Sequence, residues 1–371
     1  MSRERSADND VLLQLDAIER HFDNDCALDG LSLSVHEGEL LTLLGPSGCG
    51  KTTTLRCIAG LERLDAGQII LDGMVVADAT TSVPPERRDV GLVFQDFALF
   101  PHLTAAENIA FGIDDWPRSD RDTRVQELLE LIDLPDQANS KPGELSGGQQ
   151  QRIALARSLA PEPTILLLDE PFSNLDEAQR VRMREEVRRI LKATNTTAIS
   201  VTHDQEEALS ISDRLAVMTE GRIEQIGHPE SVFQQPRSRF VADFLGHASF
   251  LPGEVIDDHV ETSIGPIPLT QIHGLTEEYQ GSAIDVLIRP DDITALPAPD
   301  ERADGHVVYR RYLGPSVLYR VEVGNGTMLE TLHNHSDQID LDTPISIHLT
   351  ADHDLAWFPR QSDLAGYASD A

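Results

Sequence analysis

A loop of eight residues has the composition and spacing needed to bind phosphate. It consists of Gly45, Pro46, Ser47, Gly48, Cys49, Gly50, Lys51 and Thr52, fits the pattern G-x-x-x-x-G-K-[ST], and is taken together with Thr53 as the predicted site. Backbone N–H groups in such a loop surround the phosphates at a helix N-terminus, where the helix dipole favours negative charge. The Lys51 ammonium would reach the β- and γ-phosphates, and the Thr52 hydroxyl would bind Mg²⁺. The loop therefore predicts a nucleoside triphosphate site.

An acidic pair gives the second chemical signal. Asp169 and Glu170 directly follow residues 164–168, a continuous apolar run of strand length. An acid at the carboxyl end of a parallel strand points into the ligand crevice. Asp169 would hold Mg²⁺, and Glu170 would take a proton from the attacking water. An Asp-Glu pair alone is more often a solvated loop, but its combination with the phosphate loop favours triphosphate hydrolysis.

A third motif begins a helix that is expected from about Gln150. Its residues are Leu145, Ser146, Gly147, Gly148 and Gln149. By itself this stretch would be a helix start with Ser146 as the cap and two flexible glycines. Together with the phosphate loop and the acidic pair, it resembles the ATP-binding subunit of ABC transporters. The resemblance covers residues 11–245, with the motifs in the expected order and spacing.

The resemblance implies roles for further residues. Phe22 matches the aromatic that stacks on adenine, a contact worth about 1–3 kcal/mol per base, and this role is favoured over packing in a core. Gln95 matches the glutamine that senses Mg²⁺ and water and links the site to the membrane partner. His203 matches the switch histidine that contacts the γ-phosphate. The loop that crosses the dimer interface near Glu170 is matched by Ser173, Asn174, Leu175 and Asp176.

The resemblance also implies an assembly. In this family two cassettes enclose two ATP molecules, so Ser146 and Gly148 of one subunit would complete the site around Lys51 of the other. The expected cofactors are ATP and Mg²⁺, with Thr52, Gln95 and Asp169 at the metal. The expected partners are a second cassette, identical or not, transmembrane permease subunits, and indirectly an extracellular substrate-binding protein. The chain would sit at the cytoplasmic face of the membrane through its permease.

The elements that position these residues suggest two domains. Residues 11–245 alternate apolar strands, such as 39–44 and 197–202, with longer helices, as in an α/β P-loop NTPase cassette with a helical subdomain inserted at about 96–160. After about Gly246, short strand-like runs alternate with Gly, Pro and Asp turns, which predicts a small all-β, barrel-like domain over 246–371. Residues 1–10 form a polar segment with no features of a secretory signal.

Composition narrows the functional classes. The chain has 30 Lys plus Arg against 63 Asp plus Glu, a formal charge of −33, which argues against a nucleic-acid partner because phosphates would be repelled. Its three lysines are Lys51, Lys141 and Lys192. An acidic surface nearly free of lysine suits molar salt, so we expect a halophilic source, most simply a halophilic archaeon. The spacing of Cys26, Cys49 and Cys57 fits reduced thiols and no metal site.

The cargo is less constrained by the sequence. Residues 100–104, 144–152 and 171–173 look most like iron(III) importer cassettes, and Ile288-Arg289-Pro290 fits the regulatory β domains of the wider importer group. Molybdate or tungstate, polyamine, thiamine and sugar remain alternatives.

Eight of the 13 histidines lie in the C-terminal domain, including His333 and His335, and solvated polar loops are favoured over a metal site there. A cassette acting in translation or DNA repair is disfavoured because the cassette is single and uninterrupted. A module that binds ATP without turnover is disfavoured because Glu170 and His203 are both present.

Overall fold

The computed structural model describes residues 11–23, 25–324 and 326–360, so the predicted polar segment 1–10 lies outside the described residues. The chain divides into two compact units, Met1–Glu230 and Ser231–Ala371. This division falls inside α7 (Pro229–Gln234) and before α8 (Arg239–Phe244), whereas the sequence predicts the domain boundary after residue 245. The limits of the functional domains stay a prediction.

A six-stranded sheet organises the first unit, with the strand order β10-β9-β3-β8-β7-β6. All neighbours pair in parallel except β10, which is antiparallel to β9 at the edge. The strand bounds are Leu40–Leu44 for β3, Val90–Val93 for β6, Ile165–Asp169 for β7, Ala198–Thr202 for β8, Arg214–Thr219 for β9 and Arg222–Gly227 for β10. Because the parallel strands run in the same direction, the segments that follow β3, β7 and β8 meet at one edge of the sheet.

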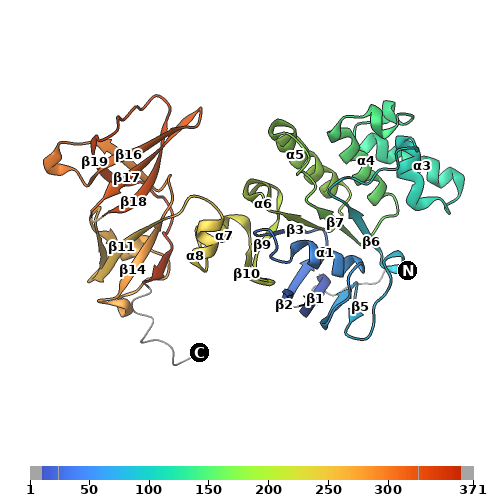
Figure 1. Cartoon of the computed structure of the whole chain (residues 1–371), viewed down its shortest axis with the longest axis horizontal. Helices are drawn as coiled ribbons and strands as arrows, with labels where there is room; N and C mark the ends of the chain where they lie inside the picture. Colours follow the sequence, from blue (N-terminus) through green and yellow to red (C-terminus); the bar gives the residue numbers. More distant parts are fainter. Residues whose placement is uncertain (1–10, 24, 325, 361–371) are drawn as a thin grey trace. The chain divides into compact units, whose positions relative to one another are not determined.

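Both faces of this sheet are covered, which explains why its central strands are apolar throughout. Leu41 and Leu43 of β3 face one core, which they share with α1 (Lys51–Ala59) and an antiparallel sheet. That sheet has the order β2-β1-β4-β5, with bounds Asp25–His36, Val11–Phe22, Ala66–Leu71 and Met74–Asp78. Leu40, on the opposite face of β3, belongs to a second core together with residues of the five helices that follow α1 in the chain. Figure 1 shows the helices and strands of both units.

The predicted helical insertion is present between β6 and β7. It contains α2 (Ala105–Ala110), α3 (Arg118–Leu131) and α4 (Gly147–Leu159), and α5 (Glu177–Ala193) and α6 (Gln205–Ile211) follow later in the chain. Thr104 and Glu107 form a capping box that starts α2. The buried Asn108 amide accepts from the Phe100 N–H and donates to the carbonyls of Phe100, Leu103 and Thr104, so it fixes the loop that leads into α2.

The second unit contains two five-stranded sheets around one core. The first sheet has the order β13-β12-β11-β14-β20, and the second has the order β15-β19-β16-β17-β18. Their bounds are Ile267–Pro268, His259–Thr262, Ser249–Ile256, Ala283–Ile288 and Trp357–Pro359, then Ile293–Pro297, Pro344–Leu349, Gly305–Tyr312, Ser316–Val323 and Thr327–Asn334. Val286 from the first sheet and Tyr319 and Ile345 from the second share this core. The predicted fold class, an α/β cassette followed by a small β domain, is confirmed.

The described residues include no helix that is both long and apolar enough to cross a bilayer.

The histidine pair of the second unit is split between two environments. His333 is buried, accepts from the Ala295 N–H through Nε2 at 3.3 Å and packs against Tyr319, whereas His335 is exposed. Burial lowers the pKa of His333. Over the described ranges, no three His, Cys, Asp or Glu side chains are grouped so that they could hold a metal ion.

Candidate active site

The phosphate loop connects β3 to α1 and depends on glycine for its close contacts. A Cβ on Gly50 would lie 2.4 Å from the Ala27 carbonyl oxygen, and Gly50 has φ +102°. A Cβ on Gly45 would lie 2.4 Å from the Met218 carbonyl oxygen. Both distances are far inside van der Waals contact, so a side chain at either position would push the loop away from the neighbouring strands. The two glycines thus hold the loop against β2 and β9.

The start of α1 has the features of an anion site. Within α1, all of which is described, the first turn contains no acidic residue, and its N-cap Gly50 supplies no side-chain hydrogen bond. The first N–H groups of this helix are therefore left for an external acceptor. The Lys51 ammonium is 6% exposed and donates to the carbonyls of Gly45 at 2.7 Å and Pro46 at 2.9 Å, which holds it inside the loop. This cradle of N–H groups and one cation fits the phosphates of a nucleotide.

Two candidate magnesium ligands meet between α1 and β7. The Thr52 hydroxyl donates to Oδ1 of Asp169 at 3.2 Å. Burial raises the pKa of Asp169, and the hydrogen bond from Thr52 opposes that shift. Hydroxyl, carboxylate and amide oxygens are suitable ligands for Mg²⁺, so the pair fits the ion. Gln95 is exposed after β6, and its carbonyl accepts from the Asn174 side-chain amide at 2.8 Å.

Glu170 and His203 face one another across the ends of β7 and β8. His203 Nδ1 lies 3.2 Å from Glu170 Oε1. The Glu170 backbone has φ +44°, a left-handed conformation that is uncommon for a residue other than glycine. Hydrogen bonds hold it there: its N–H donates to the Val201 carbonyl, and its own carbonyl accepts from the Ser173 N–H and hydroxyl. Such strain is often found where a side chain must be aimed at a reacting group.

A charged network lies behind His203, and sequence reasoning did not find it. Oδ1 of Asp204 accepts the Glu207 N–H at 3.0 Å and so caps α6. Its Oδ2 accepts from Arg184 at 2.8 Å and from Arg180 at 3.2 Å, both on α5. Arg180 also donates to the Leu175 carbonyl at 3.3 Å. The loop at 173–176 and the loop carrying His203 are therefore joined within one chain. The four-residue spacing of Arg180 and Arg184, which places both on one face of a helix, is the sequence feature that could have indicated this network.

The third motif is helical from an earlier residue than expected. α4 begins at Gly147, not near Gln150, because Ser146 and Gln149 form a capping box in which each side chain accepts from the other's backbone N–H. The two glycines therefore lie in the first turn of the helix and are not a flexible loop. A Cβ on Gly147 would be 3.5 Å from Leu175, so the motif packs close to the 173–176 loop. Leu145 is buried, while Ser146 and Gly147 are exposed.

Phe22 lies at the end of β1 and is 41% exposed, so it is not a core residue. The Arg20 guanidinium lies 4.5 Å from its ring centroid and is itself bonded to Glu62 and Asp65. A cation placed this way supports the ring on one side. Phe22 pairs with Asp25 on β2, the strand that contacts the phosphate loop at Ala27.

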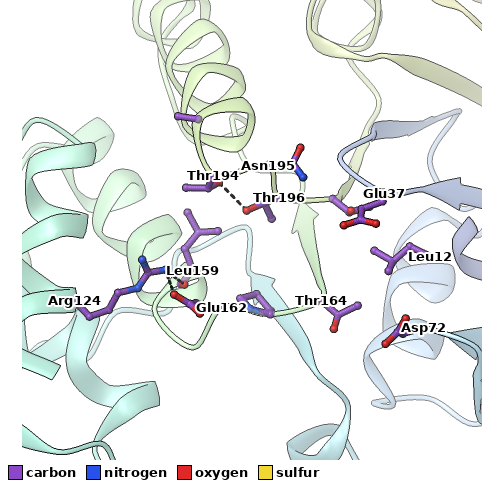
Figure 2. A pocket seen from close by; sticks show the side chains of 13 residues that line it. Leu12, Glu37, Asp72, Arg124, Leu159, Glu162, Thr164, Thr194, Asn195 and Thr196 are labelled. Atoms are coloured by element: carbon purple, nitrogen blue, oxygen red, sulfur yellow. Dashed lines mark hydrogen bonds and ion pairs between the residues drawn. The ribbon is translucent and has the colours of Figure 1, made fainter. Parts of the chain in front are cut away.

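A large hollow lies at the opposite edge of the sheet, near the amino ends of β7 and β8 (Figure 2). Its volume is about 610 Å³, and it is lined by hydroxyls and charged groups that include Thr164, Thr194 and Thr196. Arg124 and Glu162 form an ion pair on one side, and the Thr194 and Thr196 hydroxyls bond to one another. None of the predicted site residues lines it. The size of a cavity alone therefore does not identify the nucleotide site in this chain.

Comparisons with known proteins identify the family. A family profile described as "ABC transporter" matches residues 28–173, and one described as "TOBE domain" matches residues 286–357. The chain is 46% identical over 318 residues to the spermidine/putrescine import ATP-binding protein PotA of Pseudomonas fluorescens, covering 82% of this chain and 83% of that one. It is 42% identical over 333 residues to the Fe(3+) ions import ATP-binding protein FbpC of Brucella abortus, covering 89% and 93%.

Solved structures share the fold of the cassette. One is cbiO1 from Clostridium perfringens, part of an ABC transporter complex, at 28% identity and a TM-score of 0.56, covering 60% of this chain and 91% of that one. Another is a dimeric ATP-binding cassette in a post-hydrolysis state bound to ADP and Pi, at 30% identity and a TM-score of 0.51, covering 59% and 99%. The chain therefore belongs to the ATP-binding subunits of importer-type ABC transporters that carry a TOBE domain, and it is an ATPase.

Proposed function

We propose that this chain hydrolyses ATP in a dimer of cassettes and couples that hydrolysis to iron(III) import through a separate permease. The observation that carries the catalytic part is the gathering of Lys51, Thr52, Asp169, Glu170 and His203 at the carboxyl edge of β3, β7 and β8. No single one of these residue types is diagnostic. A triphosphate cradle, a metal-ligand pair and an acid–imidazole pair at one edge are what phosphoryl transfer to water requires.

Each of these residues has a distinct proposed role. Lys51 and the N–H groups at the start of α1 bind the phosphates, and Thr52, Asp169 and Gln95 hold Mg²⁺. When bound, Mg²⁺ neutralises charge on the β- and γ-phosphates. Glu170 accepts the proton of the attacking water, because its carboxylate lies at this edge, 3.2 Å from His203 Nδ1. His203 orients that carboxylate and contacts the γ-phosphate.

The proposed dimer is supported by what one chain leaves exposed. Ser146 and Gly147 lie at the surface, where the Ser146 hydroxyl accepts from the Gln149 N–H and Gly147 lies beside Leu175 of the 173–176 loop. We propose that residues 145–149 of one chain complete the nucleotide site of a second chain. Phe22, supported by Arg20, would stack on the adenine of the nucleotide bound to its own chain.

The surface proposed for the permease is a groove of about 480 Å³ between α2 and α3. Leu103, Ala106 and Val125 line it, and Phe111 at its edge is 53% exposed. Phe111 packs on Phe100 at 4.3 Å between ring centroids. The groove is tied to the Gln95 loop because Arg157 of α4 donates to the carbonyls of Phe97 and Ala98 and lies over the Phe100 ring. A short apolar helix of the permease docked here would therefore move with the catalytic edge.

Iron(III) is the proposed cargo, and polyamine is the second candidate. FbpC proteins of several species are 40–43% identical to this chain, and the matched region spans up to 93% of their length. In addition, residues 100–104, 144–152 and 171–173 resemble iron(III) importer cassettes. The specific observation favouring polyamine is the 46% identity to PotA. In either case a separate binding protein would carry the cargo to the permease, so cargo is chosen outside this chain.

The acidic surface supports the proposal of a halophilic source. Lys51 is held in the phosphate loop, and Lys192 is bonded to Asp213 at 2.6 Å and to the Gly38 carbonyl, so two of the three lysines have structural or catalytic partners. The net charge of −33 is therefore left to be screened by salt. At about 1 M salt the screening length falls to roughly 3 Å, which relieves acid–acid repulsion.

Replacing Glu170 by Gln is predicted to lower ATP turnover about 10²–10⁴-fold, because the proton acceptor is lost while the geometry is kept. ATP binding should persist, and the variant should accumulate as a closed dimer on size-exclusion chromatography with ATP. Glu162→Gln, which makes the same change at the opposite edge of the sheet, should leave turnover unchanged. Near-normal hydrolysis by Glu170→Gln would remove Glu170 from the role of base.

Deleting the gene in its host is predicted to abolish radiolabelled iron(III) uptake under iron limitation and to leave spermidine and molybdate uptake intact. Loss of spermidine uptake alone would transfer the assignment to polyamine.

Restoring the gene with Phe111→Glu should fail to recover uptake although the purified variant still hydrolyses ATP, because only the docking groove is changed. Full recovery of uptake by that variant would place the permease contact elsewhere.

The purified protein is predicted to lose secondary structure when KCl is lowered from molar to millimolar concentration, because acid–acid repulsion is then unscreened. Circular dichroism at constant pH measures this. A variant in which several exposed acids are replaced by Asn or Gln should tolerate the lower salt. A spectrum that stays the same over the whole range would rule out the halophilic interpretation.

A further inference from the structure

Glu207 is a buried carboxyl group directly behind the catalytic edge, and the ATPase roles given above do not use it. It lies in the first turn of α6 and is 2% exposed. Oε2 accepts from the Thr202 hydroxyl at 2.8 Å, whereas Oε1 is buried and has no hydrogen-bond partner among the described residues. Buried polar atoms are nearly always paired. A half-paired acid in this position therefore calls for an explanation.

The hydrogen bonds of Glu207 enclose the backbone that carries His203. Thr202, which precedes His203, donates its hydroxyl proton to Glu207 and accepts the Asp204 N–H at 3.0 Å. Asp204, which follows His203, in turn accepts the Glu207 N–H at 3.0 Å. The three residues form a closed ring of hydrogen bonds with His203 at its outer edge. The exposed imidazole has only the Glu170 carboxylate as a side-chain partner within the described chain.

We propose that Glu207 is a positioning residue for ATP hydrolysis, which acts through Thr202 and Asp204 to hold His203 against Glu170. This inference rests on the proposed function, because it takes His203 and Glu170 as the groups that meet the γ-phosphate and the water. Glu207 itself touches neither. Its effect is on the orientation of the imidazole, so a loss should appear in the rate of hydrolysis and not in the affinity for ATP.

The charge state of Glu207 gives the role a distinctive signature. Burial raises the pKa of Glu207 to about 8, and the nearby carboxylates of Asp204 and Glu170 add to the shift, while Arg184 and the Thr202 hydroxyl oppose it. Glu207 is therefore mainly the neutral acid at pH 7. Arg184 is the cation that faces it: its two terminal nitrogens donate to Glu206 and Asp204, and its buried Nε has no partner among the described residues. Ionisation of Glu207 would draw Arg184 away from Asp204 and loosen the ring.

The test compares kcat and KM for ATP of the full-length protein between pH 6.5 and 9.5 in molar KCl. The wild-type kcat should fall above about pH 8, where Glu207 ionises. Glu207→Gln, which is neutral at every pH, should keep kcat at pH 7 within about twofold and lose that decline. Glu207→Ala should lower kcat about ten- to a hundredfold with KM little changed, as expected for a misplaced catalytic group. Glu185→Gln, an exposed acid on α5, should keep the wild-type profile.

Two further variants make the result decisive. Thr202→Val removes the hydroxyl that donates to Glu207, and it should lower kcat as much as Glu207→Ala does. The double variant Thr202→Val/Glu207→Ala should have a kcat little lower than that of either single variant. His203→Ala reports on the proposed function alone. If His203→Ala abolishes turnover while Glu207→Gln keeps the wild-type pH profile and Glu207→Ala keeps the wild-type kcat, Glu207 is a packing residue and the inference is overturned. If His203→Ala has no effect, the catalytic role proposed for His203 fails, and with it the premise of this inference.

Discussion

The parallel pairing of β3, β8 and β7 is the constraint on which the site depends. Leu44 pairs with Thr202, and Asp169 pairs with Val201, so the three strands end at the same level of the sheet. The phosphate loop, the acidic pair and His203 are far apart in sequence, and they come together only because each follows one of these strands. The strands are buried on both faces, which fixes their register against slippage. Any change that shifted β8 by one residue would remove His203 from Glu170.

Around this edge, polar contacts connect parts of the chain that have different tasks. Asp204 links the His203 loop to α5 through Arg180 and Arg184, and Arg180 reaches the 173–176 loop. Asn174 of that loop bonds to the Gln95 carbonyl, and Arg157 ties the neighbouring backbone to α4. If the proposed dimer presses on residues 173–176 as it closes, it would therefore act on His203 and on the Gln95 loop together. Such a network has the connectivity that a two-state closure requires.

The local elements that carry the motifs could be predicted from the sequence because each motif is contiguous. The phosphate loop, its strand and helix, the acid after β7 and the two-domain order could be predicted from spacing and apolar runs. The predicted start of α4 lies three residues too late, because a glycine pair disfavours a helix whereas the capping box of Ser146 and Gln149 starts one there. The partners of Asp204 and the burial of Glu207 could not be predicted, since they depend on how α5 and α6 pack over β8. Composition alone also gave no reason to separate His333, which is buried, from His335, which is not.

In the proposed dimer the working site is shared between two chains. The most direct measurement mixes a Lys51→Ala chain with a Ser146→Arg chain and follows ATP hydrolysis. Each variant alone should be inactive, because every site in its dimer lacks either the phosphate cradle or the motif supplied by the partner. A mixture in equal amounts should regain about a quarter of wild-type activity, since half of the dimers are mixed and each contains one intact site if the sites act independently. Inactivity of every mixture, or full activity of Ser146→Arg alone, would contradict a site built from two chains.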